Sequence, residues 1–320
     1  MADQKHITII TDSSLLEHDT GGGEHPEVPE RLEVIKHRLA EGVLAPLLDF
    51  QQPQPATREQ LLAFHTEAWL FRMEEEVLSG RTYIDHVDNQ IGYESFTIAM
   101  LSAGTGITGI DLLEANRATN VFCLTRPPGH HAEPNMPLGF CFFNNCVVAA
   151  RHWQSCGKQR VCVFDFDAHH GNGIQTAFAE DADTLYISIH EDPCFSYPGT
   201  GCAEEHGTGE GMDTILNLPL PPGAGDAQVL DLLDDSIQAI VNDFAPQALI
   251  IAAGFDAHSS DDMSGLNYST DLYNQLGRRI KSWEQQFCPG SLLSILEGGY
   301  EFEALADSVE AYLTGLLEEP

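Results

Sequence analysis

The sequence predicts an α/β fold in which a central, mostly parallel sheet is covered by helices on both faces, giving three layers. Two observations carry this prediction. Short apolar runs alternate with longer amphipathic stretches along the chain. Five of the apolar runs also end in polar, chemically reactive residues, and an open parallel sheet binds ligands at the carboxyl ends of its strands.

The expected elements follow in chain order. Ile-Thr-Ile-Ile at 7–10 predicts a first strand, and apolar residues at helical spacing predict a helix over 29–39. Thr57-Arg-Glu-Gln60 matches a capping box that opens helices running to about Ser79. Further strands are expected at 120–125, 161–164, 184–189, 248–255 and 291–296, and further helices around 93–115, 143–156, 226–243, 270–287 and 301–317.

Long loops rich in Gly and Pro separate these elements, at 17–29, 80–92, 126–140, 192–211 and 256–268. Loops of this length inside a domain are usually functional. No linker, internal repeat or low-complexity tract interrupts the pattern, so residues 1–320 are expected to form a single domain with a substantial core.

The charge balance is strongly acidic. The chain has 15 basic and 49 acidic residues, a formal net charge of −34. Such a surface repels nucleic acid and anionic membrane and tolerates cationic ligands, so neither nucleic acid nor membrane is expected as a partner. The same balance would also suit a salty habitat, and it specifies no fold.

The cysteines and the N-terminal residues indicate a reduced, cytoplasmic environment. None of the eight cysteines forms a Cys-x-x-Cys pair, so neither a thiolate zinc site nor a disulfide framework is expected. The first residues lack the apolar segment of a signal peptide, and no uninterrupted apolar run approaches 18 residues.

The densest chemical cluster is Asp165-Phe-Asp167-Ala-His169-His-Gly-Asn172-Gly, directly after the apolar run 161–164. In extended backbone, a period of two would place Asp165, Asp167 and His169 on one side of the strand. Two carboxylates beside an imidazole are costly to bury without positive charge between them, and a divalent metal ion is the simplest compensation. On its own, the segment has a less favoured alternative interpretation as a solvated Asp/His-rich loop.

Five further segments, in order with this one, carry a family resemblance: Arg126-Pro-Pro-Gly-His130-His131, Gly139-Phe140-Cys141-Phe-Phe-Asn144-Asn145, Pro198-Gly-Thr-Gly201, Gly254-Phe-Asp256-Ala and Glu297-Gly-Gly-Tyr300. Over roughly residues 17–310 the chain resembles the arginase/deacetylase superfamily, specifically the zinc-dependent histone-deacetylase-like amidohydrolases. Among their branches it is most similar to the bacterial class II-like deacetylases. The resemblance implies the arginase/deacetylase fold, with long active-site loops at the carboxyl ends of the strands.

The resemblance also implies two metal sites. Asp167, His169 and Asp256 would bind Zn²⁺, and three ligands leave a coordination position for water and substrate. Asp and His ligands suit several divalent metals, so Fe²⁺ is an alternative in the cell. A structural K⁺ is implied at Asp165, Asp167, His169, Ser188 and Ile189, although Ser188 could equally do no more than end its strand.

The implied catalytic residues divide the proton chemistry. His131 would act as general base towards water and general acid towards the leaving amine, while His130, with Asp165 as its partner, would give electrostatic support. Asn172 stands where class I members carry an aspartate, and a neutral partner leaves the second histidine less basic. Tyr300, after two glycines, would bind the developing oxyanion.

The resemblance places substrate-binding residues around a narrow tunnel. Phe140, preceded by Gly139, and Tyr197 match the two aromatic walls of an acyl-lysine tunnel. Met263 falls where polyamine-selecting relatives can carry an acidic gatekeeper. Its apolar side chain weakens the hypothesis that the substrate is an acetylpolyamine. Asp88 matches loosely an aspartate that orients substrate backbone, but a solvated loop aspartate is the simpler interpretation.

The expected function is removal of acetyl or other acyl groups from lysine side chains of peptides or proteins. An acetylpolyamine or other small acylated amine is the alternative substrate. An arginase-like dimanganese hydrolase would need further Asp/His ligands, and a non-catalytic acyl-lysine reader would not need both histidines and Tyr300. A homo-oligomer would resemble bacterial relatives. The physiological substrate, the acyl chain length and the metal in the cell are not specified by the sequence.

Overall fold

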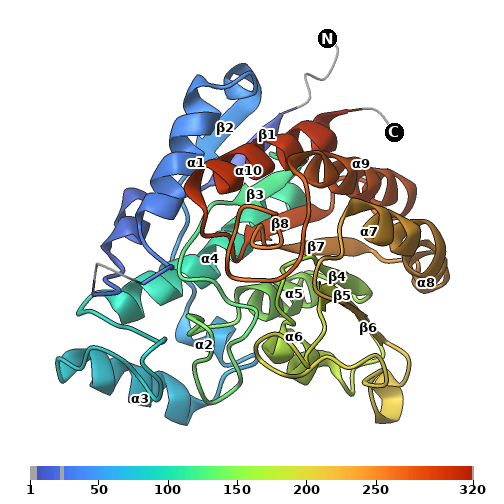
Figure 1. Cartoon of the computed structure of the whole chain (residues 1–320). Coiled ribbons are helices and arrows are strands. Elements are labelled where there is room, and N and C mark those ends of the chain that lie inside the picture. The colour runs from blue at the N-terminus through green and yellow to red at the C-terminus, as the bar shows by residue number, and fades with distance from the viewer. Residues whose placement is uncertain (1–5, 22–24, 319–320) are drawn as a thin grey trace.

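A single parallel sheet forms the centre of the protein (Figure 1). The computed structural model describes residues 6–21 and 25–318. Within these described residues, eight strands pair in parallel in the order β2-β1-β3-β8-β7-β4-β5-β6. Their bounds are β1 Ile7–Ile10, β2 Leu48–Gln51, β3 Val121–Cys123, β4 Val161–Asp165, β5 Thr184–Glu191, β6 Ile215–Leu220, β7 Ala248–Ala253 and β8 Leu292–Leu296.

Helices fill the connections between the strands. A one-turn π-helix at Leu233–Ile237 joins α7 to α8. The helices are α1 Glu30–Glu41, α2 Arg58–Leu61, α3 Glu67–Leu78, α4 Ser95–Glu114, α5 Asn145–Ser155, α6 Asn172–Phe178, α7 Asp226–Leu232, α8 Gln238–Phe244, α9 Thr270–Phe287 and α10 Phe302–Leu317.

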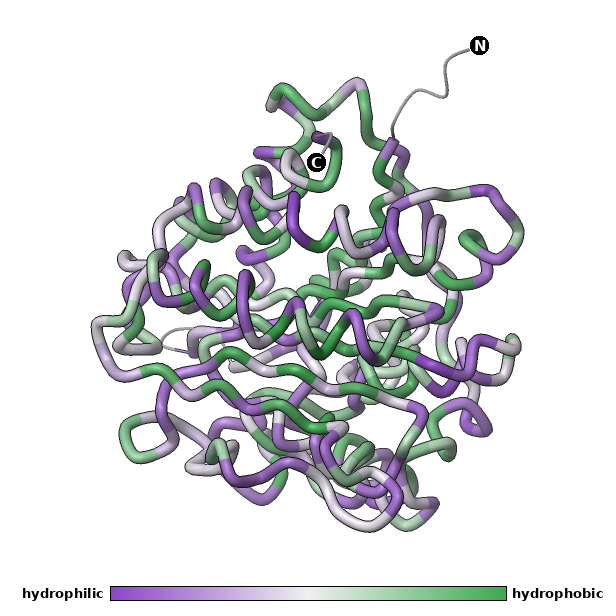
Figure 2. The backbone as a smooth tube through the Cα atoms, turned by 90° about the vertical axis from the view of Figure 1, so that its right-hand side faces the viewer, coloured by the Kyte–Doolittle hydropathy of each residue, from purple (hydrophilic) through white to green (hydrophobic). Residues whose placement is uncertain are grey.

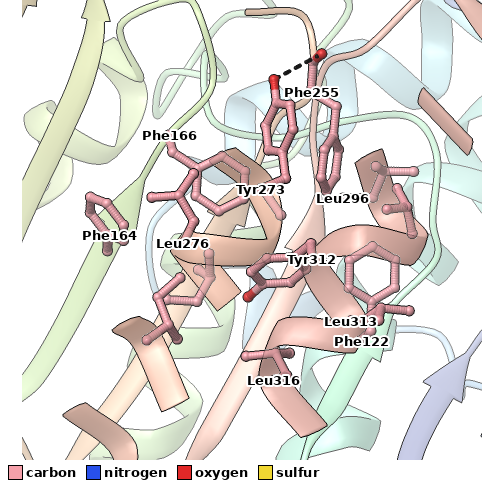
Figure 3. Packing of buried hydrophobic residues seen from close by; sticks show 14 of the residues in the cluster. Phe122, Phe164, Phe166, Phe255, Tyr273, Leu276, Leu296, Tyr312, Leu313 and Leu316 are labelled. Atoms are coloured by element: carbon pink, nitrogen blue, oxygen red, sulfur yellow. Dashed lines mark hydrogen bonds between the residues drawn. The ribbon is translucent and has the colours of Figure 1, made fainter. Parts of the chain in front are cut away.

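Each face of the sheet has its own apolar core, which confirms the three-layer prediction. On β4, Cys162 and Phe164 belong to the core under α1, α9 and α10, while Val161 and Val163 belong to the core under α5. This alternation is the period of two of a strand buried on both faces. Figure 3 shows part of the first core, where aromatic and leucine side chains from strands and helices interlock.

Helix α4 is an apolar helix in the interior. By length and composition alone it is long enough to cross a membrane, but 67% of its apolar window is buried inside the protein. A Cβ on Gly104 would lie 1.9 Å from the carbonyl oxygen of Gln54. The backbone of α4 is therefore in direct contact with the backbone at Gln54. Interspersed Ser, Thr and Gly are why no continuous apolar run marks this helix in the sequence.

The expected strands and long helices are confirmed to within a few residues, and the capping box of Thr57 and Gln60 is formed. Among the described strands and α-helices, two strands and one helix were not expected. Strand β2 is a half-exposed edge without an apolar run, and β6 is the opposite edge and contains Pro219, which a sheet tolerates at an edge. Helix α6 begins at Asn172, inside the acidic motif.

The parallel arrangement places every strand's carboxyl end at the same edge of the sheet. Residues of high hydropathy are concentrated in the central strands, and hydrophilic residues lie mainly outside them (Figure 2). The segments that follow β3, β4, β5, β7 and β8 therefore meet at one edge. The expectation that 1–320 form one domain stays a prediction, and residues 1–5, 22–24 and 319–320 lie outside the described part.

Candidate active site

Three side chains that could hold a metal ion converge at this edge. Asp167 and His169 follow β4, and Asp256 follows its neighbour β7. One ligand atom from each lies within 4.8 Å of the others, and all three residues are buried. Because β4 ends at Asp165 and the chain then turns, the expected alternation does not continue, and Asp165 lies outside this group.

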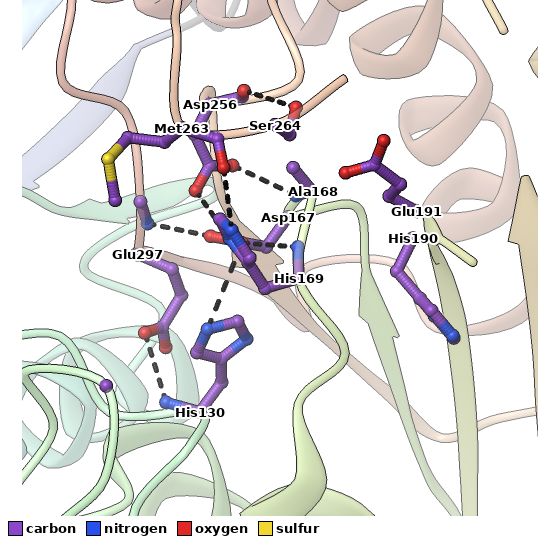
Figure 4. A network of polar contacts seen from close by, with 12 residues as sticks. His130, Asp167, Ala168, His169, His190, Glu191, Asp256, Met263, Ser264 and Glu297 are labelled. Atoms are coloured by element: carbon purple, nitrogen blue, oxygen red, sulfur yellow. Dashed lines mark hydrogen bonds and ion pairs between the residues drawn. The ribbon is translucent and has the colours of Figure 1, made fainter. Parts of the chain in front are cut away.

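The imidazole of His169 is oriented by its surroundings (Figure 4). Its Nε2 lies 3.2 Å from the carbonyl oxygen of Met263, and a carbonyl can only accept, so Nε2 carries the proton. Its Nδ1 lies 3.2 Å from Asp167 Oδ1 and 3.0 Å from Asp256 Oδ2. Nδ1 is therefore directed at the point between the two carboxylates.

Backbone groups support both carboxylates at very short range. The amide of Gly298 donates to Asp167 Oδ2 at 2.8 Å, and the amide of Ala168 donates to Asp256 Oδ1 at 2.9 Å. A Cβ on Gly254 would lie 2.0 Å from Asp167 Oδ2, and one on Gly298 would lie 2.2 Å from Asp256 Oδ2. Glycine is required at both positions because the carboxylates pack directly on the backbone.

The charges of this group call for a cation. Burial raises the pKa of Asp256, and the charge of Asp167 raises it further. Burial would also raise the pKa of Asp167, but His130 and His169 outweigh it and hold that pKa well below its usual range. Two carboxylates and one imidazole nitrogen are hard and borderline donors that suit a divalent metal with an open position. The residues present therefore fit such an ion.

Two adjacent histidines lie beside this group in different environments. His130 Nδ1 lies 3.2 Å from Asp165 Oδ2, while His131 Nδ1 donates to Asn172 Oδ1 at 2.9 Å. Burial disfavours the charged form of His130, but Asp167 and Asp165 outweigh it and raise its pKa to about 10. Burial, reinforced by the charge of His130, lowers the pKa of His131 well below 6.5, so His131 is neutral.

Buried carboxylates hold the turn that carries His130 and His131. Glu297 Oε2 accepts from the amides of Gly129 at 2.7 Å and His130 at 3.1 Å, as Figure 4 shows for His130. Burial raises the pKa of Glu297 to about 7. The hydroxyl of Tyr186 donates to Asp165 Oδ2 at 3.0 Å, which fixes the partner of His130. No role was expected for Glu297, although it opens the Glu297-Gly-Gly-Tyr300 motif, or for Tyr186, which lies in an apolar strand.

Tyr300 is placed by a turn that requires glycine and by two charged side chains. Gly299 has φ +121°, which glycine alone adopts readily. The amide of Tyr300 donates to Asp261 Oδ2 at 2.6 Å, and the guanidinium of Arg31 lies 4.8 Å from the centre of the Tyr300 ring. Burial raises the pKa of Tyr300 well above 10, so its hydroxyl keeps its proton and can donate.

A cavity of about 680 Å³ opens onto these groups. Its size is typical of small-molecule sites. Nine of the residues expected from the sequence line it: Asp88, His130, His131, Gly139, Phe140, His169, Tyr197, Met263 and Tyr300. Four lining residues were not expected, because they lie in loops without a motif of their own: His25, Pro26, Val87 and Gln90.

Gly139 shapes the wall of this cavity. It has φ +50°, and a Cβ there would lie 2.4 Å from the His131 ring and 3.0 Å from the Tyr197 ring. The next residue, Phe140, also has a positive φ of 69°, and its ring lies 5.9 Å from that of Tyr300. Both features bring aromatic faces close to the reactive side chains.

Ser188 and Ile189 lie outside the cavity lining, whereas Asp88 belongs to it. Ser188 is in register with Asp165, and its Oγ lies 2.8 Å from His190 Nδ1. The K⁺ site, including Ile189, stays a prediction. The Asp88 side chain is about half exposed and lies 2.9 Å from His86 Nδ1, so its role in substrate orientation also stays a prediction.

A parallel sheet carries a buried Asp-His-Asp group at its carboxyl edge, and together with the match to a solved structure given below this identifies an α/β protein of the arginase/deacetylase fold. Residues 25–316 match the histone deacetylase domain, and the chain belongs to the histone deacetylase family. A solved structure described as the HDA15 HD domain is 30% identical, with a TM-score of 0.91 over 98% of this chain and 90% of that one.

Named relatives come from plants, archaea and bacteria, and each is 36% identical to this chain. "Histone deacetylase 14, chloroplastic" of Arabidopsis thaliana is matched over 92% of this chain and 73% of the relative. A "Probable deacetylase" of Archaeoglobus fulgidus is matched over 92% and 81%, respectively. A "Histone deacetylase-like amidohydrolase" of Pseudomonas aeruginosa is matched over 86% and 72%.

Proposed function

We propose that the protein is a zinc-dependent amidohydrolase that removes acetyl or other acyl groups from lysine side chains of peptides or proteins. The observation that carries the proposal is one constellation: a buried Asp167–His169–Asp256 group beside a neutral His131 and a protonated Tyr300, at the base of one cavity. Family membership makes deacetylation the expected reaction class.

Asp167, His169 and Asp256 would hold the zinc ion. When bound there, zinc polarises the amide carbonyl and lowers the pKa of water. A cation at this position would also offset the negative charge of the two buried carboxylates, against which His130 and His169 already act.

The chain's own residues carry the proton steps. The Nδ1 of His131 is occupied by its hydrogen bond to Asn172, so Nε2 is the nitrogen left to accept a proton from water as the new C–O bond forms. As the C–N bond breaks, His131 returns that proton to the leaving amine. His130, paired with Asp165, stays charged and supports the developing negative charge.

Tyr300 would stabilise the oxyanion. Its hydroxyl keeps its proton at neutral pH and lies at the cavity wall, so it can donate to the oxygen on which charge develops. Removing one such donor typically lowers kcat about 10²- to 10³-fold. Gly139, Phe140 and Tyr197 would enclose the aliphatic stem of the lysine, and Met263 would close the cavity with an apolar side chain.

The test compares turnover of a fluorogenic acetyl-lysine peptide by zinc-loaded wild type, His131→Ala and Tyr300→Phe. Both variants should bind zinc normally and lose most of their turnover. Wild-type rates in both would refute the mechanism. Parallel assays with longer acyl-lysines and acetylpolyamines decide the substrate: faster acetylpolyamine turnover would favour the alternative. Urea release from arginine with two Mn²⁺ per chain would instead support an arginase-like hydrolase. Tight binding of the acyl-peptide without turnover would support a non-catalytic reader.

Three further properties belong to the same proposal. A K⁺ at Asp165, Asp167, His169, Ser188 and Ile189 would raise the melting temperature in KCl relative to choline chloride. A cytoplasmic location is supported by eight free cysteines, of which five are buried, and cell fractionation tests it. Homo-oligomerisation, as well as a single domain over 1–320, is tested by light scattering and limited proteolysis.

A further inference from the structure

Glu133 lies two residues after His131 and does not line the cavity. Its carboxylate is partly buried against the first turn of α6. Glu133 Oε1 accepts from Asn172 Nδ2 at 2.6 Å and from Thr176 Oγ1 at 3.2 Å. We propose that Glu133 is a positioning residue, which fixes the amide of Asn172 and through it the tautomer of His131. This inference rests on the proposed function, in which His131 is the base.

The orientation of the Asn172 amide follows from its partners. Its Nδ2 faces two groups, Glu133 Oε1 at 2.6 Å and the carbonyl oxygen of His131 at 3.1 Å. Both groups only accept hydrogen bonds, so the NH₂ end must face them. The oxygen end, Oδ1, then faces His131 Nδ1 at 2.9 Å.

The tautomer of His131 follows from the amide. Oδ1 only accepts, so His131 Nδ1 must carry the hydrogen, and the lone pair of the neutral ring is on Nε2. A flipped amide would present NH₂ to Nδ1. That arrangement favours hydrogen on Nε2, the nitrogen needed to accept a proton from water, and the base would be blocked.

Glu133 is the group that makes the flip costly. An aspartate at 172 would have two accepting oxygens, so its orientation would need no control. The side-chain amide of an asparagine can rotate by 180° and exchange its oxygen and NH₂ ends. Flipping it would break the charge-assisted bond to Glu133 and place Oδ1 against a carboxylate. Without Glu133, the carbonyl of His131 alone would oppose the flip.

The nearby contacts show that the arrangement is local and preformed. The amide of Gly173 donates to the carbonyl oxygen of His130 at 3.1 Å, which joins the start of α6 to the turn that carries His130 and His131. A Cβ on Gly173 would lie 2.1 Å from the carbonyl oxygen of Ala132, so the two segments are in backbone contact. Glu133 thus acts on a turn and a helix start that already touch.

The test uses Glu133→Ala, the near-isosteric Glu133→Gln, and Glu180→Ala as control. Glu180 is an exposed acid two residues beyond the end of α6 and makes no contact with Asn172 among the described hydrogen bonds. In zinc-loaded protein, Glu133→Ala should lower kcat about 10- to 100-fold with little change in KM, since partners of catalytic groups typically have effects of this size. Glu133→Gln should be intermediate and the control unchanged.

Imidazole ¹⁵N NMR of histidine-labelled protein gives a readout that needs no turnover. The His131 signal, assigned by its loss in His131→Gln, should report hydrogen on Nδ1 in wild type and a mixture of tautomers in Glu133→Ala. If the wild type proves inactive on acyl-lysine, the proposed function fails, but this spectrum still decides the role of Glu133. A pure Nδ1–H tautomer in Glu133→Ala would overturn the proposal.

A double variant separates positioning from general structural support. In an Asn172→Asp background, residue 172 can only accept, so adding Glu133→Ala should not lower kcat further. Removing the second carboxylate should instead relieve repulsion. If Glu133→Ala lowers kcat equally in both backgrounds, Glu133 serves the fold and not the amide. Should Glu133→Ala fail to fold, Glu133→Gln carries the same comparisons.

Discussion

Arg31→Lys should lower kcat while leaving the protein folded, because Arg31 holds the turn that carries Tyr300. Its side chain is fully buried, and Nε donates to the carbonyl oxygen of Gly299 at 2.6 Å. Nη2 donates to the carbonyl oxygen of Glu297 at 2.5 Å, and the guanidinium lies over the Tyr300 ring. A lysine keeps the positive charge beside Glu27 but cannot reproduce the planar fork.

The magnitude follows from the bonds lost. Lysine removes at least one of the two hydrogen bonds, and one bond from a charged donor is worth about 1.5–3 kcal/mol. Since about 1.4 kcal/mol corresponds to tenfold in rate, kcat should fall about 10- to 150-fold if the turn relaxes away from its place. Where Arg31 acts by placing the Tyr300 hydroxyl, the ceiling is the effect of Tyr300→Phe itself.

The assay is steady-state turnover of the acetyl-lysine peptide with melting temperatures measured alongside. Arg38→Lys, on the same helix but facing surface acids, is the matched control and should be neutral. In a Tyr300→Phe background, Arg31→Lys should have almost no further effect on kcat. A lowered melting temperature with unchanged kcat, or a full additional loss in the Tyr300→Phe background, would refute this reasoning.

Three other outcomes are expected. Gly254→Ala should abolish zinc binding, measured by metal analysis, because its Cβ would collide with the Asp167 carboxylate at 2.0 Å; retention of one zinc per chain would contradict the described packing. Removing zinc with a chelator should lower the melting temperature, and zinc should restore it, because the ion binds only the folded cluster. Burial alone would raise the pKa of Glu27, but Arg126 and Arg31 outweigh it and lower it to about 2. In the unfolded chain the pKa of Glu27 is 4.5. The contribution of the Glu27 carboxylate to the free energy of unfolding is therefore complete above pH 4.5 and is lost as the pH falls through about 2. Glu27→Gln should therefore cost about 3 kcal/mol in urea unfolding at pH 7, and less at pH 3, where an equal cost would disprove the linkage.

The elements that the sequence revealed were those with strong local patterns. Apolar runs located the six inner strands, and helical spacing located α9 to the residue. The two edge strands were not predicted, because β2 is half exposed and β6 contains a proline. Helix α6 escaped because its first turn coincides with a motif that was interpreted as loop.

The same distinction applies to the site. Residues in compact motifs, such as His131 and Asp256, could be named in advance, although their catalytic roles stay predictions. Arg31 could not, since a charged residue in an amphipathic helix is expected in solvent and its partners lie 268 and 266 positions away. Glu133 had no signal for a related reason: its function depends on which end of an amide faces it, and one sequence does not show orientation.

Residue 263 contributes to the protein through two separate parts. Its carbonyl oxygen orients His169, whereas its side chain lines the cavity. Any amino acid supplies the carbonyl, so the side chain at this position is free to change without altering how the His169 imidazole is held. Substrate preference can therefore diverge among descendants of this chain by exchange at a single position, with the hydrolytic chemistry inherited intact.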